Sequence, residues 1–271
     1  MGIGRDFIDL LFWLRQSGYL EKHAYVMEIG AQQLANNFLA ASAEAERLGP
    51  LFDINRPLVL PAPQPTHTLP GGQEHLQPTA PLARIFWQWL EFNHAAIDID
   101  ESPGSIPLDL NYDTVPLEEK GKYDLVTNLG TTEHVANQLN AFKLIHELTK
   151  LGGVMVHELP AQGMFNHGLI NYNPKFFWML ARSNRYKWLH TNFSVGFPHD
   201  FPTNIVDEVT KFVPQFSDRV AGYKAADCGI LVVVQKIVEM DYVAPLDVNT
   251  GTTTENEVLK RRYWTVFERP T

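Results

Sequence analysis

A strand–helix–strand segment between residues 122 and 160 constrains the fold most strongly. It reads KYDLVTNLGTTEHVANQLNAFKLIHELTKLGGVMVHELP. The apolar run from Tyr123 to Asn128 predicts a buried strand, an amphipathic helix follows it, and after a Gly-Gly turn the run from Val154 to Leu159 predicts a second strand. Two strands joined by a crossover helix form a βαβ unit, in which the strands are parallel. The segment therefore predicts an α/β fold built on a parallel sheet.

Polar side chains gather just past the ends of both predicted strands. Those after the first strand are Asn128, Thr131, Glu133 and His134, and those at the end of the second are His157 and Glu158. Ligands of open α/β sheets bind at the carboxyl ends of the strands. We therefore expect an active site at this edge.

Further elements are predicted on both sides of this segment by hydrophobic spacing and by turn residues. The predicted helices are 5–19, 33–48, 82–92 and 174–183, the last capped by Asn173 and Pro174. The other predicted strands are 23–29, 95–99, 106–110, 186–195 and 228–237. In the helix after the first strand of the βαβ unit, one buried stripe is expected, made of Val135, Leu139, Phe142, Ile145 and Leu148.

One domain over residues 1–271 is expected, with two irregular parts. Residues 50–81 are Pro-rich, with seven of the 18 prolines between 57 and 81, which predicts an insertion without long regular elements. Residues 240–271 are expected to form a C-terminal tail, polar from 247 to 256, in which Tyr263, Trp264 and Phe267 could dock.

Composition excludes several classes of protein. A net charge of -9 and a pI of about 5.5 argue against a broad nucleic-acid surface, which needs a basic face. The single cysteine, Cys228, cannot form an intramolecular disulfide and fits a reducing compartment. Residues 1–14 predict an amphipathic helix rather than a signal peptide, and no apolar run is long enough to span a bilayer. A cytoplasmic protein is expected, with no membrane or nucleic-acid partner; its oligomeric state is left open.

The strings YDLVTNLGTTEH and LTKLGGVMVHELP resemble the fourth and fifth strands of class I S-adenosylmethionine (SAM)-dependent methyltransferases. MGIGRDF at the start and NHGLINYNPKFFWMLARSN at residues 166–184 are similar to a bacterial subgroup of largely unassigned substrate. The resemblance covers roughly residues 1–237 and is thin between 50 and 81. It implies a Rossmann-like, mostly parallel seven-stranded sheet with helices on both faces, the last strand antiparallel, and the Pro-rich insertion between strands 1 and 2.

The resemblance also implies which residues bind SAM and its product S-adenosylhomocysteine (SAH). After strand 1 stand Glu28, Gly30 and Gln32, where only one glycine of the usual Gly-rich turn survives and Gln32 is expected to supply a polar contact. Asp98 matches the position that bonds the ribose hydroxyls, with Asp100 as its competitor. The remaining predicted cofactor residues are Asp109, whose carboxylate would meet the adenine amine, followed by Leu110, Asn128, Leu129, Gly130 and Glu133. Glu133 has an alternative role, capping backbone amides at a helix N-terminus.

Three histidines are the candidates for catalysis. Methyl transfer to a hydroxyl needs alignment of donor and acceptor and removal of the acceptor's proton, and a neutral imidazole suits this near pH 7. His134 or His167 is the preferred base, while His157 is either a further catalytic residue or a brace for the strand end. The same histidines with Glu158 offer an alternative divalent metal site, but no compact ligand spacing supports one, and no metal is predicted.

The predicted function is SAM-dependent methyl transfer to an oxygen, or failing that a nitrogen, of a small polar metabolite or saccharide. The amide-rich string from Asn166 to Asn173 is the expected acceptor loop, or else a plain turn. Two rivals are considered. The single glycine of the turn and Asn128, where many relatives have Asp, favour a protein that binds SAM or SAH without catalysis. A nicotinamide-dependent oxidoreductase needs a G-x-G-x-x-G turn that the chain lacks.

Overall fold

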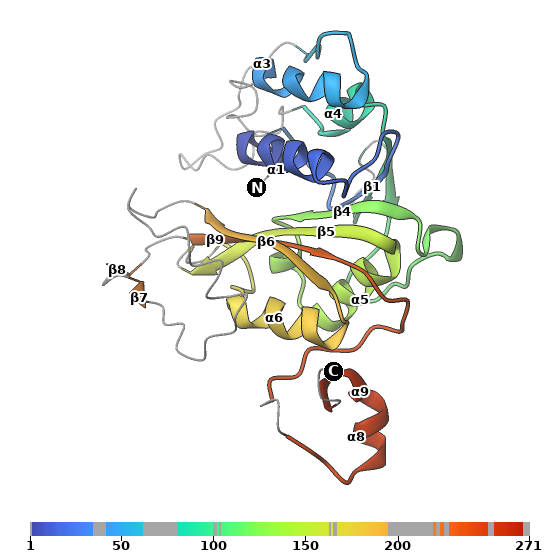
Figure 1. Ribbon diagram of the computed structural model, residues 1–271, viewed down its shortest axis with the longest axis vertical. Coiled ribbons are helices and arrows are strands. Elements are labelled where there is room, and N and C mark those ends of the chain that lie inside the picture. The colour runs from blue at the N-terminus through green and yellow to red at the C-terminus, as the bar shows by residue number, and fades with distance from the viewer. Residues whose placement is uncertain are drawn as a thin grey trace. The chain divides into compact units, whose positions relative to one another are not determined.

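The computed structural model describes residues 2–34, 42–61, 81–99, 102, 104–162, 164, 167–194, 219–220, 223–224, 228–248 and 252–267. Seven strands form one mixed sheet in the order β3-β2-β1-β4-β5-β9-β6 (Figure 1). The pairs β1–β2, β1–β4 and β2–β3 are parallel, whereas β9 runs antiparallel to both β5 and β6. The predicted Rossmann-like sheet, including its antiparallel last strand, is confirmed.

The chain divides into two compact units, each described by itself. The first comprises residues 1–109 and 123–129. Its elements are α1 (Arg5–Gln16), β1 (Tyr25–Ile29), α3 (Ser42–Ala45), the 3-10 helix η1 (Glu46–Phe52), α4 (Arg84–Trp89), β2 (Asn93–Asp98), β3 (Ser105–Pro107) and β4 (Tyr123–Leu129). The buried face of α1 contains Phe7, Ile8, Leu10, Leu11 and Leu14, as its periodicity predicts.

The extreme N-terminus packs against the chain that follows β1. Ile3 forms a parallel bridge with Leu34, and the Ile3 amide donates to the Gln33 carbonyl at 2.9 Å. A Cβ added at Gly2 would lie 2.3 Å from that carbonyl oxygen. Only a glycine allows this approach, which gives the second residue of the MGIGRDF string a physical reason.

The second unit comprises residues 110–122 and 130–271. Its elements are η2 (Leu117–Glu119), η3 (Thr132–His134), α5 (Gln138–Leu148), β5 (Thr149–Gln162), α6 (Pro174–Ser183), β6 (Lys187–Ser194), β7 (Arg219–Val220), β8 (Tyr223–Lys224), β9 (Cys228–Gln235), α8 (Glu257–Arg262) and α9 (Trp264–Phe267). Strands β7 and β8 pair with each other in a separate two-stranded sheet. Asn173 caps α6 as predicted, because its side chain accepts the Lys175 amide at 2.9 Å.

The C-terminal helices dock onto α6, as the aromatic residues of the tail suggested. The Arg182 guanidinium donates to the carbonyls of Val248 and Val266, and the Thr265 hydroxyl donates to the Ser183 carbonyl. The Arg185 guanidinium lies over the Trp264 ring at 4.4 Å from its centroid.

Three predictions of local structure were wrong. The helix expected over 33–48 does not begin at Gln33, which pairs in an isolated bridge with Leu82; its described part is α3 followed by η1, and residues 35–41 lie outside the described ranges. Leu139 is 57% exposed rather than part of the buried stripe. Glu133 and His134 do not start α5, since they form the separate turn η3, and α5 is capped by Asn137.

The Pro-rich insertion is described only at its two ends, because residues 62–80 lie outside the described ranges. Within the described part, the Trp89 indole donates to the Arg56 carbonyl at 2.9 Å. No described helix is both long and apolar enough to cross a membrane.

Candidate functional site

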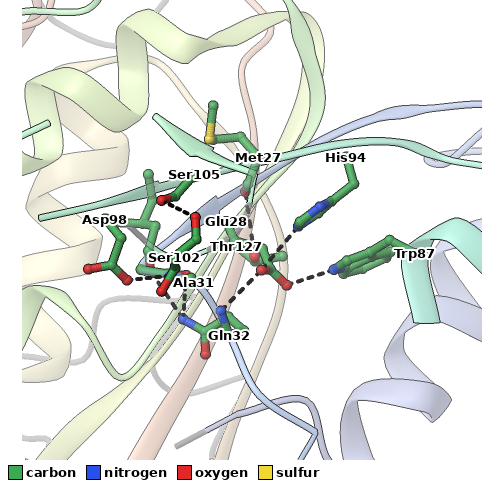
Figure 2. A network of polar contacts seen from close by, with 12 residues as sticks. Met27, Glu28, Ala31, Gln32, Trp87, His94, Asp98, Ser102, Ser105 and Thr127 are labelled. Carbon is green, nitrogen blue, oxygen red and sulfur yellow. Dashed lines mark hydrogen bonds and ion pairs between the residues drawn. The ribbon is translucent and has the colours of Figure 1, made fainter. Parts of the chain in front are cut away.

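The turn after β1 is held open by Gly30. This residue has a φ of 79°, in the left-handed region that favours glycine, and its amide donates to the Ile97 carbonyl at 2.7 Å. The next amide, that of Ala31, donates to Asp98 Oδ2 at 2.7 Å (Figure 2). The end of β2 therefore fixes the conformation of the turn after β1.

The carboxylate of Glu28 is the centre of a buried network, shown in Figure 2. Its Oε1 accepts the Trp87 indole N–H at 2.7 Å, and its Oε2 accepts the backbone amide of Gln32 at 3.1 Å. His94 Nε2 lies 3.1 Å from the same Oε2. Glu28 is 1% exposed, so these contacts replace its hydration, and the carboxylate braces the turn from within.

Gln32 is buried, and its amide group is directed at its own turn. Its Nε2 lies 3.1 Å from the carbonyl oxygens of both Ile29 and Gly30. Through these contacts the Gln32 side chain stabilises the turn, in which Gly30 is the single glycine. Its predicted contact with the cofactor stays a prediction.

Asp98 is half-buried and accepts two backbone amides. Its Oδ1 accepts from Ile99 and its Oδ2 from Ala31, both at 2.7 Å. The predicted contact of Asp98 with the ribose hydroxyls stays a prediction. Its competitor Asp100 lies outside the described residues.

The other predicted cofactor residues follow β3 and β4. Asp109 is half-buried and Leu110 is buried. Asn128 and Leu129 close β4 and are both 0% exposed, and Gly130 turns the chain with a φ of 83°. The turns after β1 and β4 therefore share one feature: in each, the strand is followed directly by a glycine in the left-handed region.

A cluster of Glu133, His134 and His167 lies in the second unit. Glu133 is 0% exposed, whereas the side chains of His134 and His167 are 51% and 38% exposed. Glu133 Oε1 lies 3.8 Å from His134 Nε2 and 3.5 Å from His167 Nε2. The two imidazole ring centroids are 5.4 Å apart. Two of the three predicted catalytic histidines are therefore brought together, with a carboxylate beneath them.

The backbone around this cluster is closely fitted. The Glu133 carbonyl accepts the amides of Leu169 and Ile170 at 2.8 and 3.1 Å. A Cβ added at Gly168 would lie 2.9 Å from Glu133 Cγ and 3.0 Å from its carbonyl oxygen. The loop that carries His167 therefore presses on Glu133 at a point where a larger residue would displace it.

A second anchor fixes the turn η3. The Tyr172 hydroxyl lies 2.9 Å from Thr132 Oγ1 and 2.6 Å from Gln138 Oε1, and Gln138 Nε2 donates to the Thr132 carbonyl at 2.7 Å. Burial raises the pKa of Tyr172, so its hydroxyl stays protonated. Tyr172 and Asn173 of the expected acceptor loop thus have structural contacts, and Asn166 lies outside the described residues.

His157 is not a member of the cluster. It is 1% exposed and packs against the rings of Phe142 and Phe177, each at a centroid distance of 5.4 Å. Burial lowers the pKa of His157 to about 3, which keeps the ring neutral. These surroundings fit the alternative of a brace for the strand end.

A family model described as "Methyltransferase domain" matches residues 5–193, well over half of the chain. The chain belongs to the methyltransferase domain family. The use of SAM as its methyl donor stays a prediction, as the resemblance of the sequence implies. No curated protein matches it significantly.

Three solved structures similar to this methyltransferase have low sequence identity to it. One is the 1,6-didemethyltoxoflavin-N1-methyltransferase of Burkholderia thailandensis with SAH, at 10% identity and a TM-score of 0.43, covering 86% of this chain and 77% of that one. Another is a SAM-dependent methyltransferase from Archaeoglobus fulgidus, at 10% identity and a TM-score of 0.40, covering 84% and 94%. Coclaurine N-methyltransferase matches at 12% identity and a TM-score of 0.43, covering 84% and 72%.

The first unit of this methyltransferase has two features expected of a cofactor site. The left-handed glycine after β1 leaves the backbone open to a close-lying ligand, and the Asp98 carboxylate at the end of β2 is held beside the same turn by the Ala31 amide. When bound, SAM supplies a methyl group on a sulfonium. The roles assigned to single residues here remain predictions.

Sequence reasoning missed three residues around the methyltransferase's sites. Trp87 and His94 complete the Glu28 network, and Gln138 anchors η3. Nothing local marks Trp87 or His94, because their contact with Glu28 spans about sixty residues of chain. Gln138 is the first residue of α5, directly after the cap Asn137, and this helix start was not predicted.

Proposed function

We propose that this methyltransferase transfers a methyl group to a hydroxyl oxygen of a small polar acceptor, with a saccharide as the first class to test. The observation that supports it is the pair of partly exposed imidazoles, His134 and His167, held beside the buried Glu133. A neutral hydroxyl is a weak nucleophile, so it gains from losing its proton as it attacks, whereas a neutral amine is nucleophilic enough to attack first and lose its proton afterwards. A basic cluster is therefore more useful to an oxygen acceptor.

The reaction balances as a single displacement. The acceptor oxygen attacks the methyl carbon of SAM, the carbon–sulfur bond breaks, and SAH leaves with the bonding electrons. The hydroxyl proton passes to a ring nitrogen of His134 or His167 and from there to solvent. The negative charge of Glu133, 3.5 and 3.8 Å from the two rings, stabilises the imidazolium electrostatically.

The chain itself ties this cluster to the predicted cofactor turn. Three residues of chain lead from Gly130 to Glu133. Consecutive Cα atoms lie about 3.8 Å apart, so the Cα atoms of these two residues are at most about 11 Å apart. A base on η3 therefore stays close to any cofactor bound at the turn after β4.

The test is SAH release from SAM with a panel of hydroxylated metabolites and nucleotide sugars, run beside matched amines. With an active hydroxyl acceptor, replacing both histidines (His134→Gln with His167→Gln) should lower kcat by about a hundredfold or more while SAM affinity stays near normal. The control is His23→Asn, an exposed histidine in the first unit. Full activity in the double variant, or turnover with amines alone, would overturn the proposal.

A further inference from the structure

The Glu133 carboxylate poses a problem of charge. It is 0% exposed, and neither of its oxygens has a hydrogen-bond partner among the described residues. Burying an ionised carboxylate without hydrogen bonds or a counter-charge is expensive. A cation beside the carboxylate would offset this cost, and the two imidazoles nearest its Oε1 offer further ligands for one.

The distances distinguish two kinds of cation. A protonated histidine bonded to a carboxylate has a nitrogen–oxygen distance of about 2.7–2.9 Å. The observed separations from Glu133 Oε1 are 3.5 Å to His167 and 3.8 Å to His134, which are too long for such a bond. Two ligand atoms that share a tetrahedral ion at about 2.0–2.2 Å lie about 3.4 Å apart. The two carboxylate–imidazole separations are close to this ligand–ligand spacing.

We propose that Glu133, His134 and His167 form a binding site for a divalent transition-metal ion. One ligand atom from each of the three lies within 4.8 Å of the others. Two imidazoles and one carboxylate suit zinc and its neighbours in the first transition series better than magnesium or calcium. Three protein ligands leave coordination positions open, which is typical of a catalytic rather than a structural site.

The surrounding contacts support a site built for this purpose. The Glu133 carbonyl is held by two amides of the His167 loop, and Gly168 allows that loop to approach. Such contacts fix the direction of ligand side chains before an ion arrives. The sequence alternative joined the three histidines with Glu158. The proposed set has Glu133 in place of His157 and Glu158, because the His157 ring is buried against Phe142 and Phe177.

A bound ion would also take part in the proposed methyl transfer, and this catalytic role rests on the proposed function. The imidazoles would then be ligands, and an acceptor hydroxyl in an open coordination position would lose its proton more easily. The proton would pass to solvent. Metal binding itself requires neither SAM nor an acceptor, so it can be tested separately.

The experiment is a titration with Co²⁺. The protein is the full chain, stripped of metal by a chelator and carrying no added histidines. Visible absorption and calorimetry are recorded for the native chain, Glu133→Gln, His167→Gln and the control His23→Asn. One equivalent should bind to the native chain and the control. Co²⁺ binding should weaken by more than about a hundredfold in the other two variants. Removing a metal ligand lowers the metal affinity more than removing a residue that only supports a ligand does. His167 is partly exposed, so its variant should fold even where Glu133→Gln does not.

Two results would overturn the proposal: no stoichiometric binding to the native chain, or equal affinity in His167→Gln. Displacement of Co²⁺ by Zn²⁺ at one equivalent would support it. The outcome is independent of methyl transfer, since SAH release in the fully stripped protein would refute only the ion's catalytic role. Loss of SAH release on stripping, with recovery on adding the ion, would support that role.

Discussion

At the scale of single residues, the buried carboxylates of Glu28 and Glu133 differ in their hydrogen-bond partners. Glu28 accepts hydrogen bonds from Trp87 and Gln32 and lies 3.1 Å from His94, so it stabilises a turn. Glu133 is equally buried but has no hydrogen bond to its oxygens among the described residues. The difference in partners, rather than in burial, separates the structural carboxylate from the one available for chemistry.

Asp98→Ala should weaken SAM binding by about 1–3 kcal/mol, as expected when a buried hydrogen-bond partner is removed. The substitution also removes the acceptor of the Ala31 amide, which loosens the turn after β1. Calorimetric titration with SAM and SAH measures the effect, with Asp6→Ala on α1 as the control. Unchanged affinity would remove the ribose assignment from Asp98 and pass it to Asp100.

The sequence located the candidate site only in part at this scale. His134 and His167 are brought together as expected, because one follows β4 and the other follows β5. His157 is on the same strand as predicted, but the side chain's burial against Phe142 depends on packing that no local pattern records. The role of Glu133 was ambiguous for the same reason: capping depends on where the helix begins, and α5 begins at Gln138.

At the scale of elements, predictions succeeded where the signal is local. The strands β1, β4 and β9 are short apolar runs bounded by turn residues, and α6 has its cap and proline in sequence. The prediction for 33–48 failed because Gln33 pairs with Leu82, a partner about fifty residues away. Tertiary pairing here overrides helical propensity.

Asn173→Ala should destabilise the protein by about 1 kcal/mol, within the usual range of about 0.5–2 for a lost helix cap. The Asn173 side chain accepts the Lys175 amide at the start of α6, and Ala cannot do so. Urea denaturation measures the free energy of unfolding. Asn173→Asp is the matched control, since Asp also caps helices and should retain stability. Equal losses in both variants would mean that the side chain acts through some contact other than the cap.

At the scale of the whole molecule, two buried histidines make the folded state sensitive to acid. Burial lowers the pKa of His157 to about 3, and desolvation lowers that of His146 as well. An unfolded histidine has a pKa of about 6.5. As the pH falls from about 6.5 to about 3, the unfolded chain therefore takes up protons that folded His157 refuses, and stability falls.

His157→Phe should reduce this acid sensitivity. Between pH 7 and pH 5, the native chain should lose about 2 kcal/mol more of its free energy of unfolding than the variant does. Urea denaturation at the two pH values measures both losses. The exposed His23→Asn should behave like the native chain. If the native chain and His157→Phe lose the same amount, His157 is protonated in the folded state near its ordinary pKa.

The shared acceptor at Glu133 has a spectroscopic consequence. The amides of Leu169 and Ile170 both donate to its backbone carbonyl, which belongs to the same residue as the charged side chain. Their NMR chemical shifts are therefore natural reporters of whatever occupies the carboxylate. In an isotope-labelled sample, these two resonances would register a proton, an ion or an acceptor at Glu133 without any added probe.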